Sequence, residues 1–184
     1  IALACADQMG ISPAAAAPNL SRMSPIPGRY NTLSTTIGTW IVVDYAHTPD
    51  AVTNVVAETR SHVAGKITVV VGAGGDRDME KRPLMGQAAG TADLVVVTND
   101  NPRSEDPDKI IASVVSGVTS GAEIVIEKDR RLAIRTALAA AGPDDAVLIL
   151  GKGHEKGQEF AGETIPFDDS LVAREEIARL EEAR

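Results

Sequence analysis

The sequence predicts an α/β fold: a mainly parallel β-sheet with helices on both faces and an N-terminal β-hairpin. The first observation is that short runs of Val, Ile and Leu alternate with segments whose apolar residues recur at helical spacing. The second is that these runs are apolar at consecutive positions, which is typical of parallel strands buried on both faces. Apolar residues make up 43% of the chain and aromatic residues only 3%, so we expect a core of Val, Ile, Leu and Ala.

The apolar runs locate the strands. Five are expected to form the parallel sheet, at residues 40–46, 66–72, 93–98, 122–127 and 145–151. The first should pair with the segment that begins at Tyr30, with Gly38 at or near the turn of this hairpin. A second, small hairpin is predicted at residues 157–167.

The helices between the strands carry start signals. They are expected at residues 48–65, 81–90, 106–118, 129–142 and 168–184. Thr48, Asp106 and Asp129 are predicted N-caps, because their side-chain oxygens can accept hydrogen bonds from free backbone amides. Pro49 and Pro107 follow two of these caps and lie in the first turn, where proline is tolerated.

The first 25 residues differ from the rest. A predicted helix ends at Gly10, and a segment rich in Pro, Ala and Ser follows, which we expect to be a linker with one short helix. The chain begins at Ile1, without Met and inside the apparent helix, so we expect a piece of a longer protein. The predicted division is residues 1–25 as the tail of a preceding domain and its linker, and 26–184 as the main domain.

Charge and cysteine content exclude several classes of protein. A net charge of −8 and an isoelectric point near 4.9 argue against general nucleic-acid binding, although a local basic cluster could still hold a small anion. The one cysteine, Cys5, excludes an internal disulfide and fits a reducing compartment. No apolar run approaches the roughly 20 residues of a membrane helix, and no secretory signal is recognisable. We therefore expect a cytoplasmic location.

Four loops that follow predicted strands carry charge beside Gly, Pro or Asn. They are residues 44–50, 72–83, 99–107 and 151–157. One polar loop is explained by helix caps, but parallel strands bring all four loops to one edge of the sheet, where ligands bind in such folds. The cations of this edge are Arg77, Lys81, Arg82, Arg103, Lys152 and Lys156, and its acids are Asp44, Asp76, Asp78, Asp100 and Glu155. Both signs together suit a zwitterionic amino acid, alone or beside a nucleotide, better than a phosphate alone.

Several common motifs are absent. The stretch GAGGDR has Arg77 where the dinucleotide-binding fingerprint needs Gly, and GKGHEKG lacks the Walker pattern. His47, His62 and His154 show no metal-ligand spacing, and His62 is expected to be an ordinary surface residue. Cys5 lies in a helix and is more readily explained by packing than as a nucleophile.

Five stretches in this order resemble the C-terminal domain of Mur ligases, and in particular of their meso-diaminopimelate-adding members. They are PGRYN, VVDYAHTPDA, GAGGDRDMEKRPLMG, TNDNPRSEDP and GKGHEKGQ. The resemblance implies a Rossmann-like domain of an enzyme that joins meso-diaminopimelate to UDP-MurNAc-L-Ala-D-Glu with ATP and Mg²⁺, through an acyl phosphate. It also implies that residues 1–25 end the central ATPase domain, which supplies the P-loop, the Mg²⁺ ligands and a modified lysine. No catalytic residue is then expected within this chain, and the isolated chain is expected to be inactive.

The resemblance also assigns roles to residues. Arg29 of PGR and Asp44 of DYAH would face ATP, and His47 of the same DYAH motif would lie near the nucleotide. Residues of the GDRD, DNPR and GKGHE motifs would bind the incoming diaminopimelate. These are Arg77, Asp100, Asn101, Arg103, Gly151 and Glu155.

Two other interpretations stay open at this point. The first is a related ligase, of the cyanophycin synthetase or folylpolyglutamate synthase type. Cyanophycin synthetase would share PGR, DYAH and GDR, but the pair DNPR and GKGHE argues against it. A non-catalytic module that binds an amino acid or a nucleotide is the second alternative.

Overall fold

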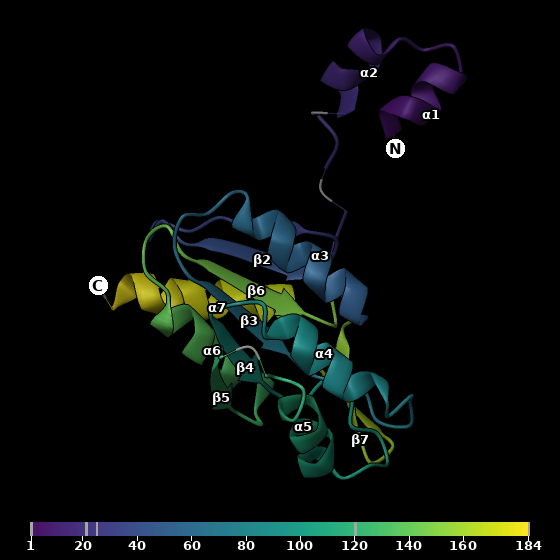
Figure 1. Ribbon diagram of the computed structural model, residues 1–184. Helices are drawn as coiled ribbons and strands as arrows, with labels where there is room; N and C mark the ends of the chain where they lie inside the picture. The colour runs from purple at the N-terminus through teal and green to yellow at the C-terminus, as the bar shows by residue number, and fades with distance from the viewer. Residues whose placement is uncertain (1, 21, 25, 120, 184) are drawn as a thin grey trace.

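The computed structural model describes residues 2–20, 22–24, 26–119 and 121–183. Its main part has three layers, a central sheet with helices on both faces (Figure 1). The six strands of the sheet are β1 (Asn31–Leu33), β2 (Trp40–Asp44), β3 (Ile67–Val71), β4 (Leu94–Val97), β5 (Glu123–Ile126) and β6 (Ala146–Leu150). They lie in the order β1-β2-β6-β3-β4-β5, with β1 antiparallel to β2 and all other pairs parallel. The predicted fold class and the N-terminal hairpin are confirmed.

The order of the strands determines which loops meet. β6 is the last strand of the sheet in the sequence, yet it lies between β2 and β3. The loop after β6, which begins at Gly151, therefore lies between the loops that begin at Tyr45 and Gly72. Ligands of open α/β sheets bind where the strand order reverses in this way.

Side chains of the central strands point alternately to two hydrophobic cores. Val42, Val95 and Leu148 face α3 (Pro49–Arg60), α4 (Lys81–Ala89) and α5 (Pro107–Val115). Ile41 and Ile149, one position away in the sequence, face α6 (Arg130–Ala140) and α7 (Asp169–Glu182). Both cores consist of aliphatic residues and Ala, with one Met, as the composition predicts.

The predicted N-caps are confirmed. Thr48 accepts a hydrogen bond from the backbone amide of Ala51, and Asp106 accepts one from Asp108. Asp129 likewise accepts from Leu132 at the start of α6.

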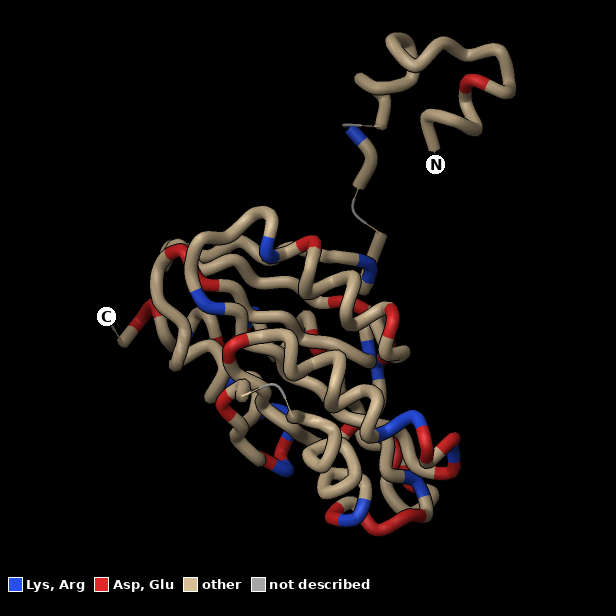
Figure 2. Tube along the Cα trace, in the orientation of Figure 1, with Lys and Arg blue, Asp and Glu red and all other residues tan. Residues whose placement is uncertain are grey.

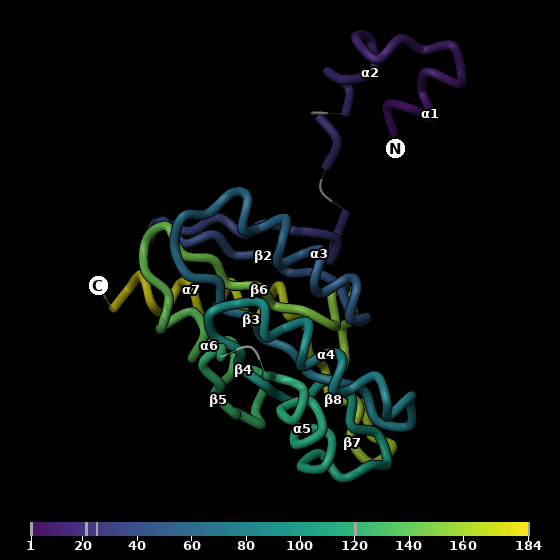
Figure 3. Tube along the Cα trace, in the orientation of Figure 1, coloured from purple at the N-terminus to yellow at the C-terminus, as the bar shows by residue number. Residues whose placement is uncertain are grey.

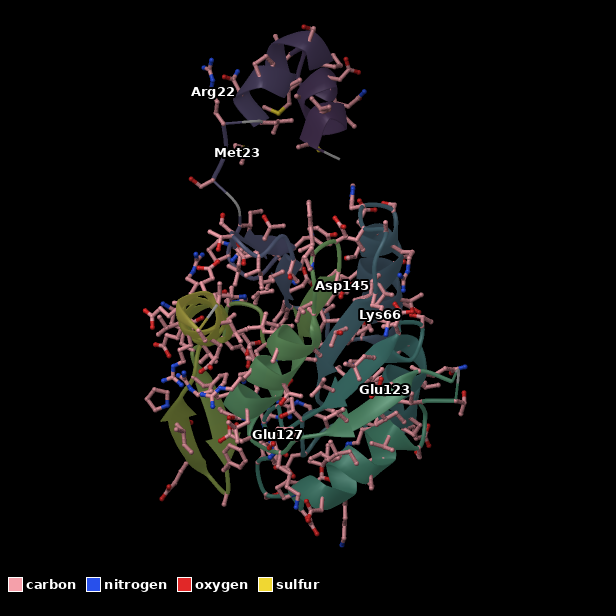
Figure 4. All side chains as sticks on the ribbon, turned by 90° about the vertical axis from the view of Figure 1, so that its left-hand side faces the viewer. Arg22, Met23, Lys66, Glu123, Glu127 and Asp145 are labelled. Carbon is pink, nitrogen blue, oxygen red and sulfur yellow. The ribbon has the colours of Figure 1, made fainter. Side chains whose placement is uncertain are left out.

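Strand β5 departs from the expectation that all parallel strands are buried on both faces. It forms an edge of the sheet, and Ile126 is 54% exposed. Figure 4 shows Glu123, the first residue of this strand, and Glu127, which directly follows it. Charged side chains at an edge strand disfavour pairing with a further strand.

Residues before the sheet form α1 (Ala2–Gln8) and α2 (Pro13–Leu20), which lie apart from the sheet (Figure 3). Arg22 and Met23 follow α2 on the side of the sheet (Figure 4). This agrees with the predicted helix and the linker with one short helix. Cys5 lies in α1 as expected, but it is exposed, so the described residues do not explain it by packing. Within the described part of the chain, no helix has the length and apolarity needed to cross a membrane.

A two-stranded hairpin, β7 (Gly157–Phe160) and β8 (Glu163–Pro166), stands outside the sheet. It attaches to the loop after β4 through a parallel bridge between Arg103 and Phe160. The predicted second hairpin is thus confirmed, and it contacts the candidate site.

Candidate functional site

A cavity of about 470 Å³ opens where β3, β4 and β6 end; we call it the edge cavity. Figure 2 shows charged residues of both signs crowding the segment that precedes α4, on this side of the molecule. The cavity is lined by Tyr45, His47, Gly72, Ala73, Gly74, Arg77, Asp78, Lys81, Arg82, Met85, Asp100, Asn101, Arg103, Gly151 and Glu155.

The structure brings together all six residues expected to bind the amino acid. Arg77, Asp100, Asn101, Arg103, Gly151 and Glu155 line the edge cavity, although they come from three loops. Of the three residues expected near ATP, His47 lines the cavity, whereas Arg29 and Asp44 are not among its lining residues.

Close backbone packing holds the loops after β3 and β4 together. The amide of Gly75 donates a hydrogen bond to the carbonyl oxygen of Asn101 at 2.9 Å. A Cβ atom on Gly75 would lie 1.8 Å from the carbonyl oxygen of Pro102, so only glycine permits this approach. Asp76 adds side-chain contacts, because its carboxylate accepts hydrogen bonds from the amide and the hydroxyl of Ser104.

Arg103 is held on several sides. It has a φ of +53°, an unusual left-handed conformation for a residue other than glycine. The backbone is fixed by hydrogen bonds from its amide to the carbonyl of Glu159 and from the amide of Ala161 to its own carbonyl. Its guanidinium donates from Nε to Glu159 and from Nη1 to the carbonyl of Gly75, at 3.1 and 2.8 Å. Pro102 disfavours helical geometry at Asn101, and the helix starts only at Pro107, so Arg103 remains in the loop that follows the strand.

The two arginines of the GDRDMEKRP loop have different environments. The Arg77 guanidinium is exposed, and its one described hydrogen bond runs from Nη1 to the carbonyl of Asp76. Arg82 is 3% exposed and pairs with Glu105 at 2.7 Å. Arg77 can therefore reach a ligand carboxylate, whereas Arg82 stabilises the loops.

Hydrogen bonds lower the pKa values of two acids beside the cavity. Those from Ser104 lower the pKa of Asp76, with smaller effects of the Arg103 and Arg77 charges. The hydrogen bond from Arg82 lowers the pKa of Glu105, which also accepts one from the amide of Asp76. Both groups are therefore carboxylates at neutral pH, and they hold the two loops in register.

Lys152 is a buried residue of the site for which the sequence suggested charge but no role. Its side chain is 0% exposed, and its ammonium lies 3.2 Å from Glu155 and 3.4 Å from Asp100. A third hydrogen bond, of 3.0 Å, goes to Oδ1 of Asn101. The signal available in the sequence was its position between two glycines in GKGHE.

The residues expected near ATP lie around Tyr45, a second residue that the sequence prediction missed. The Arg29 guanidinium lies 4.7 Å from the centre of the Tyr45 ring, and His47 meets the ring edge-on at 4.5 Å. Asp44 is 9% exposed, and its two oxygens accept hydrogen bonds from the amides of Tyr30 and Ala46. Asp44 thus shapes this loop directly, and Arg29 and His47 present polar groups at its surface.

Beneath the loops lies a fully buried ion pair. Arg130 donates from Nε and Nη2 to the two oxygens of Asp169, at 2.8 and 2.7 Å. The same Nη2 reaches the carbonyl of Leu150, the last residue of β6. A weaker contact of 3.4 Å joins Nη1 to the carbonyl of Asn99 after β4. The pair therefore connects the ends of two strands that carry site loops.

No cluster of three or more His, Cys, Asp and Glu side chains suited to a metal ion occurs in residues 2–20, 22–24, 26–119 and 121–183. His62 contacts Glu58 and stacks on Trp40 at the surface, away from the edge cavity.

The chain is similar to two bacterial UDP-N-acetylmuramoyl-L-alanyl-D-glutamate–2,6-diaminopimelate ligases. It is 48% identical to that of Aquifex aeolicus over 151 residues, which are 82% of this chain and 31% of the relative. It is 43% identical to that of Caldanaerobacter subterraneus over 183 residues, which are 98% of this chain and 38% of the relative. The chain thus spans about a third of the length of these curated relatives.

The chain is also similar to parts of solved ligase structures. A structure of a UDP-N-acetylmuramoyl-L-alanyl-D-glutamate–2,6-diaminopimelate ligase matches with a TM-score of 0.81 and 41% identity, over 98% of this chain and 37% of that one. A UDP-N-acetylmuramate-alanine ligase from Thermotoga maritima, at 19% identity, matches with a TM-score of 0.67, over 99% of this chain and 36% of that one, and shares the fold. The family model described as Mur ligase, glutamate ligase domain, matches residues 28–153. With the motifs of the edge cavity and these matches in agreement, the chain belongs to the Mur ligase family.

Proposed function

We propose that this chain is the C-terminal domain of an ATP-dependent ligase that adds meso-diaminopimelate to UDP-MurNAc-L-Ala-D-Glu. In this proposal residues 26–184 position the incoming amino acid and part of ATP, and residues 1–25 belong to the central domain and the linker. The other domains of the same protein would bind the UDP-MurNAc-dipeptide. The reaction would take place in the cytoplasm and supply peptidoglycan precursor.

The convergence of four side chains in one cavity carries the proposal. Arg77, Asn101, Arg103 and Glu155, separated by up to 78 positions, line the edge cavity together. Two guanidinium groups suit carboxylates, because their paired N–H groups match the two carboxylate oxygens. Glu155 and Asp100 offer carboxylate acceptors for ammonium groups. A ligand with both charges at each end fits this arrangement.

The chemistry of the distal end separates diaminopimelate from lysine. The distal carbon of meso-diaminopimelate carries an ammonium and a carboxylate, whereas that of lysine carries only the ammonium. Arg103 is 22% exposed and already bound on one side by Glu159. With lysine, the donors of Arg103 that face away from Glu159 would have no carboxylate partner, which disfavours the smaller ligand.

The residues proposed to face ATP offer groups that can contact a phosphate and a ribose. Arg29 lies exposed over Tyr45, where a cation can meet a phosphate, and His47 opens onto the edge cavity. Asp44 is occupied by two backbone amides, and each carboxylate oxygen keeps one acceptor position for a ribose hydroxyl. ATP, bound with Mg²⁺ through the other domains, would supply the phosphoryl group that activates the carboxyl of the dipeptide.

The contribution of this domain would be to orient the amino group of the incoming amino acid for its attack on the acyl phosphate. Good alignment of two reactants is worth roughly 7–11 kcal/mol of barrier. The sequence holds no Walker loop, so the proposal includes that the chain alone has no ligase activity.

The test is the amino-acid preference of the complete ligase that carries this chain. With ATP, Mg²⁺ and UDP-MurNAc-L-Ala-D-Glu, we expect kcat/KM for meso-diaminopimelate to exceed that for L-lysine by about 10⁴-fold. Equal use of both amino acids would contradict the proposed substrate, and glutamate addition to a folate would favour the related ligase class.

A further inference from the structure

Lys152 lies behind the wall of the edge cavity, not in it. It is absent from the residues that line the cavity, but its three hydrogen-bond partners, Asp100, Asn101 and Glu155, all line it. An ammonium has three donors, and here each has one acceptor. Lys152 therefore holds the wall together without reaching a ligand.

The contacts of Lys152 also fix the orientation of the Asn101 amide. Oδ1 of Asn101 accepts from Lys152 and from the backbone amide of Glu159, both at 3.0 Å. Nδ2 of Asn101 donates to Glu155 at 3.1 Å. A flipped amide would turn its NH₂ group toward two donors, so only one orientation is compatible with these neighbours.

The charges of this group do not cancel. One ammonium faces two carboxylates, those of Asp100 and Glu155, which leaves one formal negative charge. The buried Arg130 beneath is balanced by Asp169, so it does not remove this excess. The excess is directed to the cavity, because the Glu155 side chain is 35% exposed while Lys152 is 0% exposed.

We infer that Lys152 is the positioning residue of the amino-acid site: it aligns Asn101 and Glu155 and leaves one carboxylate charge to receive an ammonium of the ligand. This inference rests on the proposed function, because it assigns the ammonium-binding half of the same cavity. Two carboxylates without Lys152 would repel each other, and the Asn101 amide would lose one of the three hydrogen bonds that orient it. The carboxylates that should accept hydrogen bonds from the ligand ammonium would then be out of position.

The flanking glycines allow this arrangement. Gly151 has a φ of +110°, and a Cβ atom on it would lie 2.8 Å from Oδ2 of Asp100. Gly153 has a φ of +55°, and a Cβ atom on it would lie 2.6 Å from Cβ of Tyr45. The backbone can therefore turn on both sides of Lys152 and direct its side chain inward.

Kinetics of Lys152→Met in the complete ligase test the inference. Methionine keeps most of the volume and removes the charge, so we expect KM for diaminopimelate to rise about 10- to 100-fold. KM for ATP should stay within about twofold. The matched control is Lys156→Met, an exposed lysine four positions on that does not line the edge cavity. An unchanged KM for diaminopimelate, or an equal rise of both KM values, would overturn the inference.

Chemical rescue gives a readout that a purely structural role would not produce. Lys152→Ala leaves space for n-propylammonium, which should lower the raised KM for diaminopimelate, whereas n-propanol at the same concentration should not. Equal effects of the two additives, or none, would count against a role of the ammonium.

The variant Asp100→Asn tests the charge balance of this group while Lys152 stays in place. It also tests the inference if the Lys152 variants do not fold. The change is isosteric and reduces the net charge of the group from one negative to zero. KM for diaminopimelate should rise at unchanged KM for ATP, and an unchanged KM would overturn the inference. Wild-type ligase that does not use diaminopimelate would instead contradict the proposed function, so the two failures are distinguishable.

Discussion

Arg103 Nε donates a hydrogen bond of 3.1 Å to Oε2 of Glu159, a residue 56 positions further along the chain. The backbones of the same two residues are joined as well, by a hydrogen bond of 3.1 Å from the Arg103 amide to the Glu159 carbonyl. The β7–β8 hairpin therefore supports the loop after β4, and the left-handed backbone of Arg103 is held from outside the sheet. Such strained residues persist only where the surrounding structure determines them.

Removal of the Glu159 charge should loosen the Arg103 side chain. We expect Glu159→Gln to raise KM for diaminopimelate about 2- to 10-fold, because a half-exposed ion pair contributes little more than about 1 kcal/mol. Steady-state kinetics of the complete ligase measure this. The control is Glu163→Gln on the opposite strand of the same hairpin, where the side chain is exposed and no change is expected. Equal effects of both variants would show that Glu159 has no specific role.

A methyl group on Gly75 should separate the loops after β3 and β4. Gly75→Ala would press its Cβ against the carbonyl oxygen of Pro102, a backbone atom that cannot turn aside. We expect the free energy of unfolding to fall by about 1–3 kcal/mol, measured by urea denaturation. Gly142→Ala is the control, since its Cβ would meet its nearest neighbour at an ordinary 3.6 Å. A Gly75 variant as stable as the control would refute this packing.

Loss of one partner of the buried ion pair should be costly. Asp169→Asn leaves the fully buried Arg130 without a counter-charge, so we expect a loss of about 3–5 kcal/mol in the free energy of unfolding. The exposed pair of Lys128 and Asp108 provides the comparison, and Asp108→Asn should cost less than about 1 kcal/mol. Similar costs for the two variants would contradict the burial of the Arg130 pair.

Acid should weaken the contact between α6 and α7 through Glu176. Hydrogen bonds from Arg135 and Arg131 lower the pKa of Glu176 from its ordinary value of 4.5. A carboxyl whose pKa is lower in the folded state stabilises the fold above its unfolded pKa, and this contribution is lost as the pH falls through the folded pKa. We therefore expect the free energy of unfolding to decrease from about pH 5 downward.

Glu176→Gln should flatten that dependence, because glutamine does not titrate. Urea denaturation at several pH values between about 3 and 7 measures the slope. Its neighbour Glu175 is more exposed and, among the described residues, pairs with Arg131 alone, so Glu175→Gln should leave most of the slope in place. If the free energy of unfolding of the Glu176 variant depended on pH as in the wild type, other groups would cause the acid sensitivity.

Local signals made much of the fold predictable. The apolar runs gave five parallel strands, and Thr48, Asp106 and Asp129 gave the starts of three helices, because caps depend on neighbouring residues only. Strand β5 was predicted as a buried strand because Ile124, Val125 and Ile126 are apolar, yet its place at the edge depends on strand order. Strand order is a long-range property, which a single sequence does not specify locally.

The site was predictable where its residues lie in loops after strands. Arg77, Asn101, Arg103 and Glu155 were expected together, because parallel strands bring their ends to one edge. The role of Lys152 was not predictable, since charge in a loop suggests exposure and the side chain is buried. Nor did the sequence indicate the Arg103–Glu159 contact, which depends on how the β7–β8 hairpin folds back.

The KM values of Arg103→Ala in the complete ligase test the central claim most directly, namely that the edge cavity is the amino-acid site. Arg103 would contact the distal carboxylate of diaminopimelate, so its loss should raise KM for diaminopimelate about 10- to 100-fold. KM for ATP should remain within about twofold of the wild-type value. Equal loss of diaminopimelate and ATP binding, or no loss of either, would contradict the account.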